Sequence, residues 1–488
     1  NLGGHKAYIK QLHRLLINCG ASVAVAPPTF VDFLTEAAEG LNLPFVGCSE
    51  DFMDLPEASA ELMPSEADEL AYLQYTSGST RFPRGVMITQ ETVMENLSRI
   101  SKYGVKTRPG DRAMSWLPFF HDMGLVGLVL APMSSQNSVD YLGTRDFAMR
   151  PRLWLKLITE NRSTVSFSPP FGYELCVKRL RLSDINKFDL SSWRLAGVGA
   201  ETIRPEPLMQ FADNLSLAGF NPDALVACYG MAECSLAVSF APLEQGISVD
   251  RVDAEYLAEF QQALSVTDDL DANPSKAKSF VLCGEALPGY EIEVRDDLGR
   301  KLPDRHCGTL FVRGPSVMSG YFGEPELTRE VLSSDGWLNT GDIAYYINDE
   351  IVITGREKDM IILNGRNIWP QDIEYLAEQQ PELRTGDASA FSVSGPAGVD
   401  IAVLVLECRQ TDEAKRLDLV NRMHGEIRTE LGIDVFIELV PRNTLPRTTS
   451  GKLSRSGARK DFLKRVENGQ TEDPFSAFHD SVPLRKAG

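Results

Sequence analysis

The residues with the clearest chemical signature lie between Tyr75 and Gly85, in the order Tyr-Thr-Ser-Gly-Ser-Thr-Arg-Phe-Pro-Arg-Gly. Small hydroxyl side chains and glycine let several backbone N–H groups face one anion, so this run predicts a phosphate-binding loop. It is not a Walker sequence, because Gly-x-x-x-x-Gly-Lys-Ser/Thr is absent and the basic residue, Arg84, stands within Pro-Arg-Gly. A linker rich in serine, threonine and glycine is the alternative for this segment taken alone.

Four further segments carry residues of catalytic type and follow this run along the chain. They are Tyr229–Glu233, Trp337–Asp342, Gly355–Asp359 and Pro446–Lys452. Each has an ordinary alternative, with Glu233 as a surface carboxylate, Asp342 as a turn former after glycine, and Lys452 as one member of a basic face.

In this order, and over almost the whole chain, the five segments resemble the motifs of the adenylate-forming superfamily, which contains acyl-CoA synthetases, luciferases and the adenylation domains of peptide synthetases. The resemblance implies an α/β fold, with a large N-terminal adenylation domain of several subdomains and a small, mobile α+β C-terminal domain. It also implies that the protein uses ATP and Mg²⁺. The reaction would join a carboxylic acid to AMP.

The resemblance further implies which residues bind the nucleotide. The aromatic ring of Tyr229 would lie against adenine, Glu233 would engage Mg²⁺, and Asp342 and Arg356 would bind the ribose. The full nucleotide-binding set is Thr76, Ser77, Gly78, Ser79, Thr80, Gly199, Ala200, Glu201, Cys228, Tyr229, Gly230, Met231, Ala232, Asp342, Arg356 and Lys452.

The catalytic residues implied are Lys452, Glu233 and Thr76, with Lys358 as the hinge. A carboxylate that attacks the α-phosphorus gathers negative charge on the phosphoryl oxygens, and Lys452 and Mg²⁺ would neutralise that charge. Thr76 and the rest of its loop would hold the departing pyrophosphate. The nucleophile is already ionised at neutral pH, so no general base is needed, in agreement with the lack of a Ser/His/Asp constellation.

Several details resemble one branch of the superfamily, the fatty acyl-AMP ligases. They are the segments Trp116–Gly124, Gly3–Tyr8, Gly199–Glu201 and Gly365–Glu374. The long polar stretch Pro242–Lys278 resembles an insertion that this branch carries and that is linked to its loss of CoA use. The resemblance therefore implies a fatty acid substrate. The acyl group would pass to the phosphopantetheine of an acyl carrier protein or of a polyketide or peptide synthase carrier domain.

Other functions stay open at this point. An acyl-CoA synthetase would pass the acyl group to CoA, and a peptide-synthetase adenylation domain is a third possibility. A pseudoenzyme that only binds nucleotide or acyl-AMP is suggested by Ala232, which replaces the threonine of the superfamily and removes a hydroxyl near the phosphates. Retention of the four charged residues at positions 233, 342, 356 and 452 argues against a pseudoenzyme.

The residues expected to contact the acid are His121, Phe171 and Met231. His121 has an alternative role as a core histidine packed beside Phe119 and Phe120, because an unpaired histidine is more often structural. Phe171 follows two prolines and is equally consistent with ordinary core packing.

The elements that must position these residues follow an α/β pattern. Apolar spacing predicts helices over Arg152–Glu160 and Gly172–Leu180 and a strand over Ser163–Phe167, and this alternation indicates a substantially parallel sheet. Beyond Gly355 a smaller α+β unit follows, with helices predicted over Gln371–Gln379 and Thr411–Leu431. We expect an adenylation domain over residues 1–355, with its leading segment missing and an insertion at about 242–278, and a mobile domain with the catalytic lysine over residues 356–488.

The composition favours a multidomain protein, since 488 residues exceed what one compact core usually holds. The longest apolar stretch, Gly124–Met133, is too short to span a bilayer. A net charge of −19 disfavours nucleic acid and anionic membranes as partners. Eight scattered cysteines predict reduced thiols and a cytoplasmic location.

One segment, Arg442–Arg465, opposes this overall acidity with many basic residues and Asp461 alone against them. Carrier proteins are usually acidic, so we expect this segment to dock the carrier. A solvated basic face without a partner is the alternative.

Overall fold

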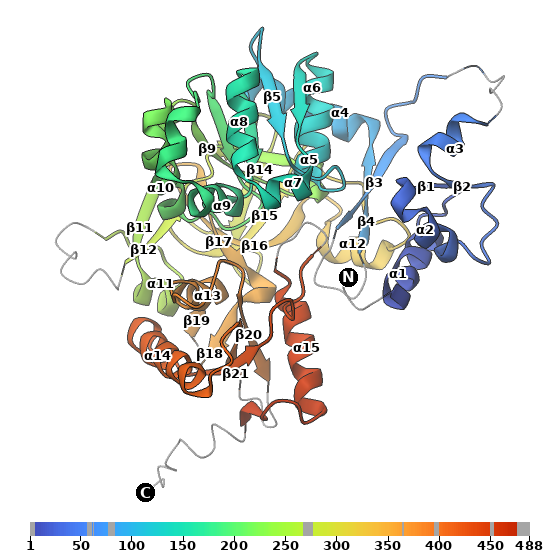
Figure 1. The fold of residues 1–488 in the computed structure, drawn as a ribbon. Coiled ribbons are helices and arrows are strands. Elements are labelled where there is room, and N and C mark those ends of the chain that lie inside the picture. The colour runs from blue at the N-terminus through green and yellow to red at the C-terminus, as the bar shows by residue number, and fades with distance from the viewer. Residues whose placement is uncertain are drawn as a thin grey trace, which may run out of the picture.

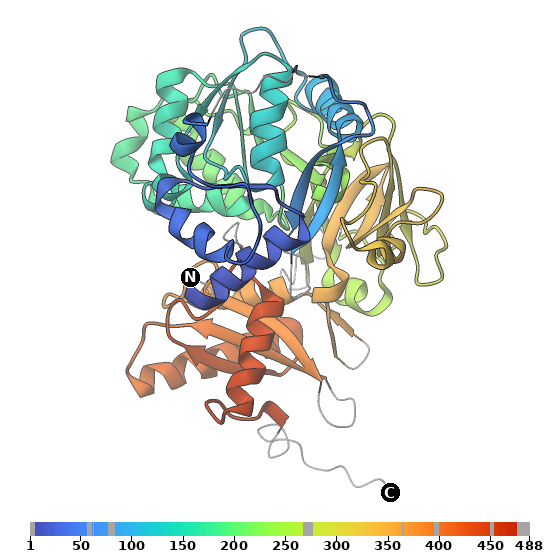
Figure 2. The same ribbon diagram turned by 90° about the vertical axis from the view of Figure 1, so that its right-hand side faces the viewer.

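The computed structural model describes residues 5–55, 61, 63–76, 83–266, 277–363, 366–394, 400–448 and 453–475. Two bodies are visible in Figure 1, a large one coloured blue to yellow and a smaller one, orange to red, that holds the elements from β18 onward. Figure 2 shows from a second direction that the small body lies at one end of the large one. Within the described residues, no helix is both long enough and apolar enough to cross a lipid bilayer.

The large body is built on a seven-stranded sheet with the strand order β13-β10-β9-β8-β7-β5-β6. The strands are β5 (Arg112–Ser115), β6 (Ser138–Tyr141), β7 (Val165–Ser168), β8 (Leu195–Val198), β9 (Leu225–Gly230), β10 (Ala237–Phe240) and β13 (Glu285–Ala286). Strands β5 to β9 pair in parallel, whereas β10 pairs antiparallel with β9 on one side and with β13 on the other. Every residue of β7 and β8 is buried, as expected for parallel strands covered on both faces. The predicted parallel sheet is confirmed.

Helices cover this sheet. They are α4 (Gln90–Arg99), α5 (Asp122–Leu125), α6 (Ala131–Ser134), α7 (Thr144–Met149), α8 (Arg152–Asn161), α9 (Pro170–Arg179) and α10 (Pro205–Leu215). Two π-helical turns, η2 (Ile100–Gly104) and η3 (Val126–Leu130), continue α4 and α5. The two helices predicted from the sequence here are confirmed as α8 and α9. Helix α9 begins earlier than expected because a proline at the first helical position fits there without loss of a hydrogen bond.

Smaller sheets and helices complete the large body. Two antiparallel pairs are formed by β3 (Leu70–Thr76) with β4 (Arg84–Thr89) and by β11 (Val249–Asp253) with β12 (Ala277–Val281). A four-stranded antiparallel sheet is formed by β14 (Glu291–Arg295), β15 (Gly308–Arg313), β16 (Leu338–Ile347) and β17 (Glu350–Arg356). The remaining elements are α1 (His5–Asn18), β1 (Val23–Val25), α2 (Val31–Ala37), β2 (Phe45–Gly47), α3 (Ser49–Met53), α11 (Ala254–Phe260) and α12 (Pro325–Val331).

The small body has a three-stranded sheet with helices on both faces. Its elements are β18 (Ile361–Leu363), β19 (Arg366–Ile368), α13 (Pro370–Glu378), β20 (Ala388–Ser394), β21 (Asp400–Glu407), α14 (Glu413–Leu431), β22 (Val435–Val440) and α15 (Arg455–Glu467). Helices α13 and α14 pack on one face and α15 on the other, because alternate residues of β20 and β21 point to opposite sides. Helix α14 was predicted, but its buried residues are Leu419, Met423 and Ile427, and Leu417 is 61% exposed.

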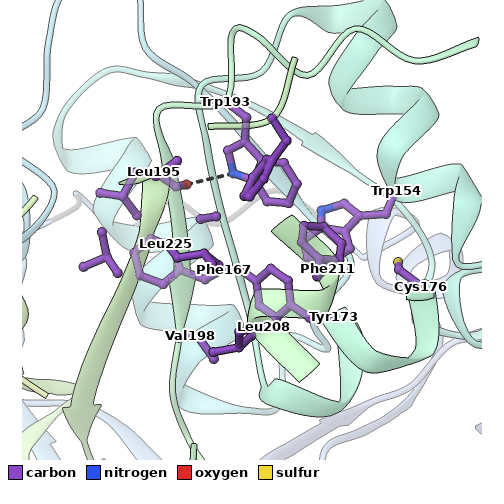
Figure 3. Close-up of a cluster of buried hydrophobic side chains, with 14 of the residues drawn as sticks. Trp154, Phe167, Tyr173, Cys176, Trp193, Leu195, Val198, Leu208, Phe211 and Leu225 are labelled. Carbon is purple, nitrogen blue, oxygen red and sulfur yellow. Dashed lines mark hydrogen bonds between the residues drawn. The ribbon is translucent and has the colours of Figure 1, made fainter. Parts of the chain in front are cut away.

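The main core of the large body is aromatic (Figure 3). Trp154 is fully buried and makes edge-to-face contacts with Trp193 and Tyr173 at ring-centroid distances of 5.1 and 5.3 Å. Trp193 donates its indole N–H to the Leu195 carbonyl at 2.8 Å, and Trp154 donates to the Ser166 hydroxyl at 2.9 Å. The rings of Trp154 and Trp193 therefore fill the space between the sheet and its helices with both indole N–H groups paired.

We expect Trp154→Ala to lower the free energy of unfolding by about 3–5 kcal/mol, since it leaves a cavity in this core and removes the hydrogen bond that the indole donates to Ser166. Urea denaturation followed by circular dichroism measures the change. Leu417→Ala is the matched control and should cost about 0.5 kcal/mol or less, because most of that side chain already lies in water. A similar loss in both variants would contradict this account of the core.

Candidate active site

A cleft of about 1630 Å³ is lined by residues of both bodies. The sequence-predicted site residues that line it are Thr76, His121, Phe171, Ala200, Glu201, Cys228, Tyr229, Gly230, Met231, Ala232, Glu233, Asp342, Arg356 and Lys358. Gly199 lies directly behind this wall, since a Cβ there would sit 2.7 Å from the Cys228 carbonyl oxygen. The expected ligands Ser77, Gly78, Ser79, Thr80 and Lys452 lie outside the described residues.

Asp342 is the polar centre of the cleft. Its side chain accepts a hydrogen bond from the Tyr229 hydroxyl at 2.6 Å and one from Arg356 Nε at 2.9 Å. The second contact follows from strand register, because Asp342 on β16 pairs directly with Arg356 on β17. Asp342 is 4% exposed, whereas the Arg356 side chain is 60% exposed toward the cleft.

These contacts also set the ionisation of the two partners. Burial raises the pKa of the Tyr229 hydroxyl well above its usual value, and the neighbouring Asp342 charge raises it further. The negative charge of Asp342 raises the pKa of the Arg356 guanidinium. The cluster therefore holds a neutral phenol and a permanent cation beside one carboxylate.

Glu233 lies near this cluster, in the short 3₁₀ turn η7 (Ala232–Cys234) that follows β9. Burial raises the pKa of its carboxyl, and a hydrogen bond donated by the Tyr321 hydroxyl at 2.9 Å lowers it again. The Arg84 guanidinium stacks over the Tyr321 ring at 5.3 Å, and its buried Nε has no hydrogen-bond partner among the described residues. Tyr321 was not expected, because nothing in one sequence links it to a carboxylate 88 positions earlier.

Two positions at the cleft have a constrained backbone. A Cβ at position 230 would lie 1.9 Å from the Leu236 carbonyl oxygen, so only glycine lets β9 and β10 approach this closely. Ala200 has φ +71, a conformation that costs a residue with a side chain about 1–3 kcal/mol. Both positions belong to the predicted nucleotide-binding set, and both hold backbone close to the cleft.

The three residues expected to contact the acid all line the cleft. His121 caps helix α5 by accepting the Met123 N–H on Nδ1 at 3.2 Å. It is not a core histidine beside two buried rings, because Phe119 and Phe120 are 52% and 60% exposed. Phe171 packs edge-on against Trp116 with centroids 5.6 Å apart.

Two groups of polar contacts flank the hinge region. Lys278, on β12, lies 2.6 Å from Asp372 of α13 and 4.1 Å from the centre of the Trp369 ring. Burial lowers the pKa of Lys278, whereas Asp372 acts in the opposite direction. The stretch 242–278, expected to be an insertion, thus reaches the small body through β12, and α11 also contacts β19.

Arg455 forms ion pairs of 2.8 Å with Asp359, in the turn between β17 and β18, and of 2.7 Å with Glu374 of α13. Arg465 is paired with Glu438 at 2.6 Å. The segment expected to be a basic face is therefore partly neutralised. Its exposed cations on α15 are Arg459, Lys460 and Lys464.

Within the described part of the chain, no three His, Cys, Asp or Glu side chains gather as a ready metal site. Glu233 offers one carboxylate to the cleft. Magnesium in nucleotide enzymes commonly takes one or two carboxylates, with phosphate oxygens and water completing its octahedron. One carboxylate that faces the cleft therefore fits Mg²⁺ that is delivered with a nucleotide.

Comparisons with known proteins agree with this site. The family of AMP-binding enzymes matches residues 9–322. A protein of Caulobacter vibrioides, provisionally named an acyl-CoA synthetase, is 44% identical over 95% of this chain and 80% of its own length. The medium-chain-fatty-acid–[acyl-carrier-protein] ligase JamA of Moorena producens is 33% identical over 94% of this chain and 79% of its own length.

A solved structure from a study of fatty acyl-adenylate ligases of E. coli and L. pneumophila superposes with a TM-score of 0.90. It is 44% identical and covers 95% of this chain and 82% of its own. The fold, the motif order and these relatives lead to one conclusion: the chain belongs to the AMP-binding enzymes of the adenylate-forming superfamily and, within it, to the fatty acyl-AMP ligases.

Proposed function

We propose that this enzyme activates a fatty acid with ATP, forms acyl-AMP and pyrophosphate, and passes the acyl group to the phosphopantetheine of an acyl carrier protein. The observation that carries the proposal is the arrangement of one cleft. Its polar part holds Asp342 between Tyr229 and Arg356, with Glu233 nearby, and its lining continues into apolar side chains such as Phe167 and Phe240. A cleft of this kind suits a molecule with a nucleotide at one end and a hydrocarbon at the other.

Each polar residue has a proposed part in the first step. Tyr229 lies beside adenine, and Asp342 still has lone pairs for the ribose hydroxyls after accepting its two hydrogen bonds. Arg356 adds a cation on the ribose side. Fixing the ribose orients the α-phosphate for in-line attack by the fatty carboxylate.

The phosphates are held by Thr76, its loop and Arg84, which stacks on Tyr321. Glu233 would hold Mg²⁺, and the metal would neutralise charge on the phosphates when bound. Tyr321 fixes the Glu233 carboxylate in place by donating its hydroxyl proton. Lys452 supplies a further positive charge where the transition state gathers negative charge.

The proposed domains are residues 1–355 and 356–488. Lys358 lies exposed in the 3₁₀ turn η10 (Glu357–Asp359), directly after β17 and before β18. Its exposed position between two strands suits a pivot between two bodies. Rotation there would change which part of the small body faces the cleft.

The acyl acceptor has two candidates. The Moorena relative is named a ligase that uses an acyl carrier protein, which favours a carrier protein. The Caulobacter relative is named an acyl-CoA synthetase, which favours CoA. We favour the carrier because the stretch 242–278 is anchored on the small body through Lys278, Asp372 and Trp369. This stretch resembles the insertion that fatty acyl-AMP ligases carry and that is linked to their loss of CoA use.

The central experiment measures the products formed from ATP, Mg²⁺ and a panel of fatty acids. We expect pyrophosphate and acyl-AMP with a medium or long acid, and little acyl-CoA when CoA is added. A phosphopantetheinylated carrier protein should become acylated. Efficient acyl-CoA formation would favour the synthetase function, and no pyrophosphate with any acid would remove the proposal.

Two variants should separate binding from chemistry. Lys452→Ala should slow adenylation in single turnover by about 3 kcal/mol, or more than a hundredfold, with ATP binding retained. Asp342→Asn should raise the KM for ATP about tenfold or more, because it removes a charged acceptor from the ribose side.

The matched controls are Lys464→Ala and Asp349→Asn, which change the same residue types at exposed positions. Both should behave as wild type. Near-normal single-turnover adenylation by Lys452→Ala, or an unchanged KM in Asp342→Asn, would refute the corresponding role.

Carrier docking is expected on the exposed cations of α15. The double variant Lys460→Glu/Lys464→Glu should slow carrier acylation about tenfold at low salt and less at high salt, with acyl-AMP formation unchanged. Arg455 is left out because its ion pairs with Asp359 and Glu374 are structural. Lys415→Glu, exposed on α14 of the same body, is the control. Equal carrier loading by all three proteins across salt concentrations would exclude this surface.

A further inference from the structure

The turn that carries Glu233 ends in a strained backbone conformation. Ser235 has φ 63 and ψ −56, and the Leu236 N–H donates across it to the Cys234 carbonyl at 2.8 Å. A three-residue hydrogen bond with these angles is a γ-turn of the rare, strained form. Ser235 is not glycine, so its side chain adds a steric cost to the positive φ. Other contacts must therefore hold the turn in this shape.

One set of contacts comes from the segment between Ser316 and Tyr321. The Ser316 hydroxyl donates to the Cys234 carbonyl at 2.7 Å, and the Met318 N–H donates to the Glu233 carbonyl at 2.8 Å. The Tyr321 hydroxyl donates to the Glu233 carboxylate at 2.9 Å. This segment therefore holds both the backbone of the turn and the side chain that the turn presents to the cleft.

Ser316 is itself held by a chain of hydrogen bonds that starts on helix α4. Asn96 Nδ2 donates to the Tyr290 hydroxyl at 2.8 Å, and the Tyr290 hydroxyl contacts that of Ser316. Since an amide nitrogen only donates and a carbonyl only accepts, the chain runs in one direction, from Asn96 through the two hydroxyls to the Cys234 carbonyl. Each hydroxyl both accepts and donates, so removal of one leaves its neighbours without a partner.

Asn96 also fixes the start of β10. Its Oδ1 accepts the Ala237 N–H at 3.1 Å, and its Nδ2 donates to the Ala237 carbonyl at 2.8 Å. These two contacts determine which way the amide faces, because each backbone group of Ala237 can pair with only one of its ends. One side chain thus sets the position of the strand that leaves the turn and begins the hydroxyl chain that reaches the turn itself.

The network lies behind the cleft and is shielded from water. Asn96 and Ser316 are fully buried and Tyr290 is 8% exposed. A Cβ at position 314 would lie 2.4 Å from the Tyr290 ring, so Gly314 provides the space for it. None of the three polar residues is among the described residues that line the cleft. Because a fully paired buried network is rigid, it can fix the geometry of a site that it does not touch.

We propose that Asn96, Tyr290 and Ser316 form a positioning network that holds the Glu233 carboxylate where it binds the magnesium ion delivered with ATP. The inference rests on the proposed role of Glu233. The network acts through the Cys234 carbonyl, and loss of one link lets the γ-turn relax and moves the carboxylate. Magnesium accepts little departure from octahedral geometry, so a small movement of its ligand weakens the site.

The test uses Ser316→Ala, which removes the central hydroxyl, and Tyr290→Phe, which removes one hydroxyl and keeps the ring. Ser166→Ala is the matched control. Ser166 is also fully buried, accepts the Trp154 indole N–H at 2.9 Å and donates to the Met114 carbonyl at 2.6 Å, but it lies on β7. Both serine variants therefore lose the same kinds of contact, and thermal melting should show similar losses of stability.

Isothermal titration calorimetry measures the Kd of α,β-methylene-ATP, which cannot form acyl-AMP, once with excess Mg²⁺ and once with EDTA. The ratio of the two constants reports how far the metal tightens nucleotide binding. Ser316→Ala should reduce this ratio about tenfold, and Tyr290→Phe should reduce it less. Ser166→Ala should keep the wild-type ratio, and the Kd in EDTA should be the same in all four proteins.

Steady-state pyrophosphate release gives a second measurement. Ser316→Ala should lower kcat and leave the KM for the fatty acid unchanged, because the network does not reach the described residues that contact the acid. Ser166→Ala should leave both constants unchanged. If Ser316→Ala does not fold, Tyr290→Phe decides the outcome, since its ring still fills the space over Gly314.

Glu233→Gln separates this inference from the function on which it rests, and it should reduce the ratio about tenfold or more. A reduced ratio in Glu233→Gln with wild-type ratios in the two network variants would overturn the inference and leave the role of Glu233 intact. An equal reduction in Ser166→Ala would also overturn it, because general loosening of the large body would then explain the effect. A wild-type ratio in Glu233→Gln would remove the metal role of Glu233 and the inference with it.

Discussion

The shared carboxylate of Asp342 holds the functional cleft together. It joins the end of β9 in the parallel sheet to β16 and β17 of the antiparallel sheet, because Tyr229 and Arg356 both donate to it. A buried charge of this kind is stable only while its partners stay in place, and removal of one partner commonly costs about 3–5 kcal/mol. The nucleotide side of the site therefore depends on the two sheets keeping their relative position.

That relative position is secured by close packing as much as by hydrogen bonds. Gly230 lets β10 approach β9, and Gly197 lets the Phe167 ring lie over β8. Glycine has more conformational freedom than other residues in the unfolded chain, so folding loses more entropy at each of these positions. In return, one hairpin carries Tyr229 and Glu233 on the polar side and Leu236 and Phe240 on the apolar side, so a bound acyl-AMP would contact both along its length.

The described residues at the junction between the two bodies include several polar contacts. Lys278 meets Asp372 and Trp369, and Arg204 lies 3.6 Å from Glu378 and over the Tyr375 ring. Burial raises the pKa of Glu378 to about 7, so this pair is weakened by protonation near neutral pH. Contacts of this kind hold an orientation without locking it, which suits the proposed rotation of the small body about Lys358.

The sequence by itself determined the family and the parallel sheet, and it pointed to most of the polar residues that line the cleft, because each motif needs particular residue types at short spacing, as in Tyr229 to Glu233. It also predicted helix α14, but apolar spacing shows that a face exists and not which residues the neighbours cover, and Leu417 on that helix is exposed. Only the tertiary structure brought Tyr321 to Glu233, paired Arg455 with Glu374, and joined Asn96 to Tyr290. These contacts join residues far apart in the chain, and their formation depends on strand register and packing, which leave no local pattern in one sequence.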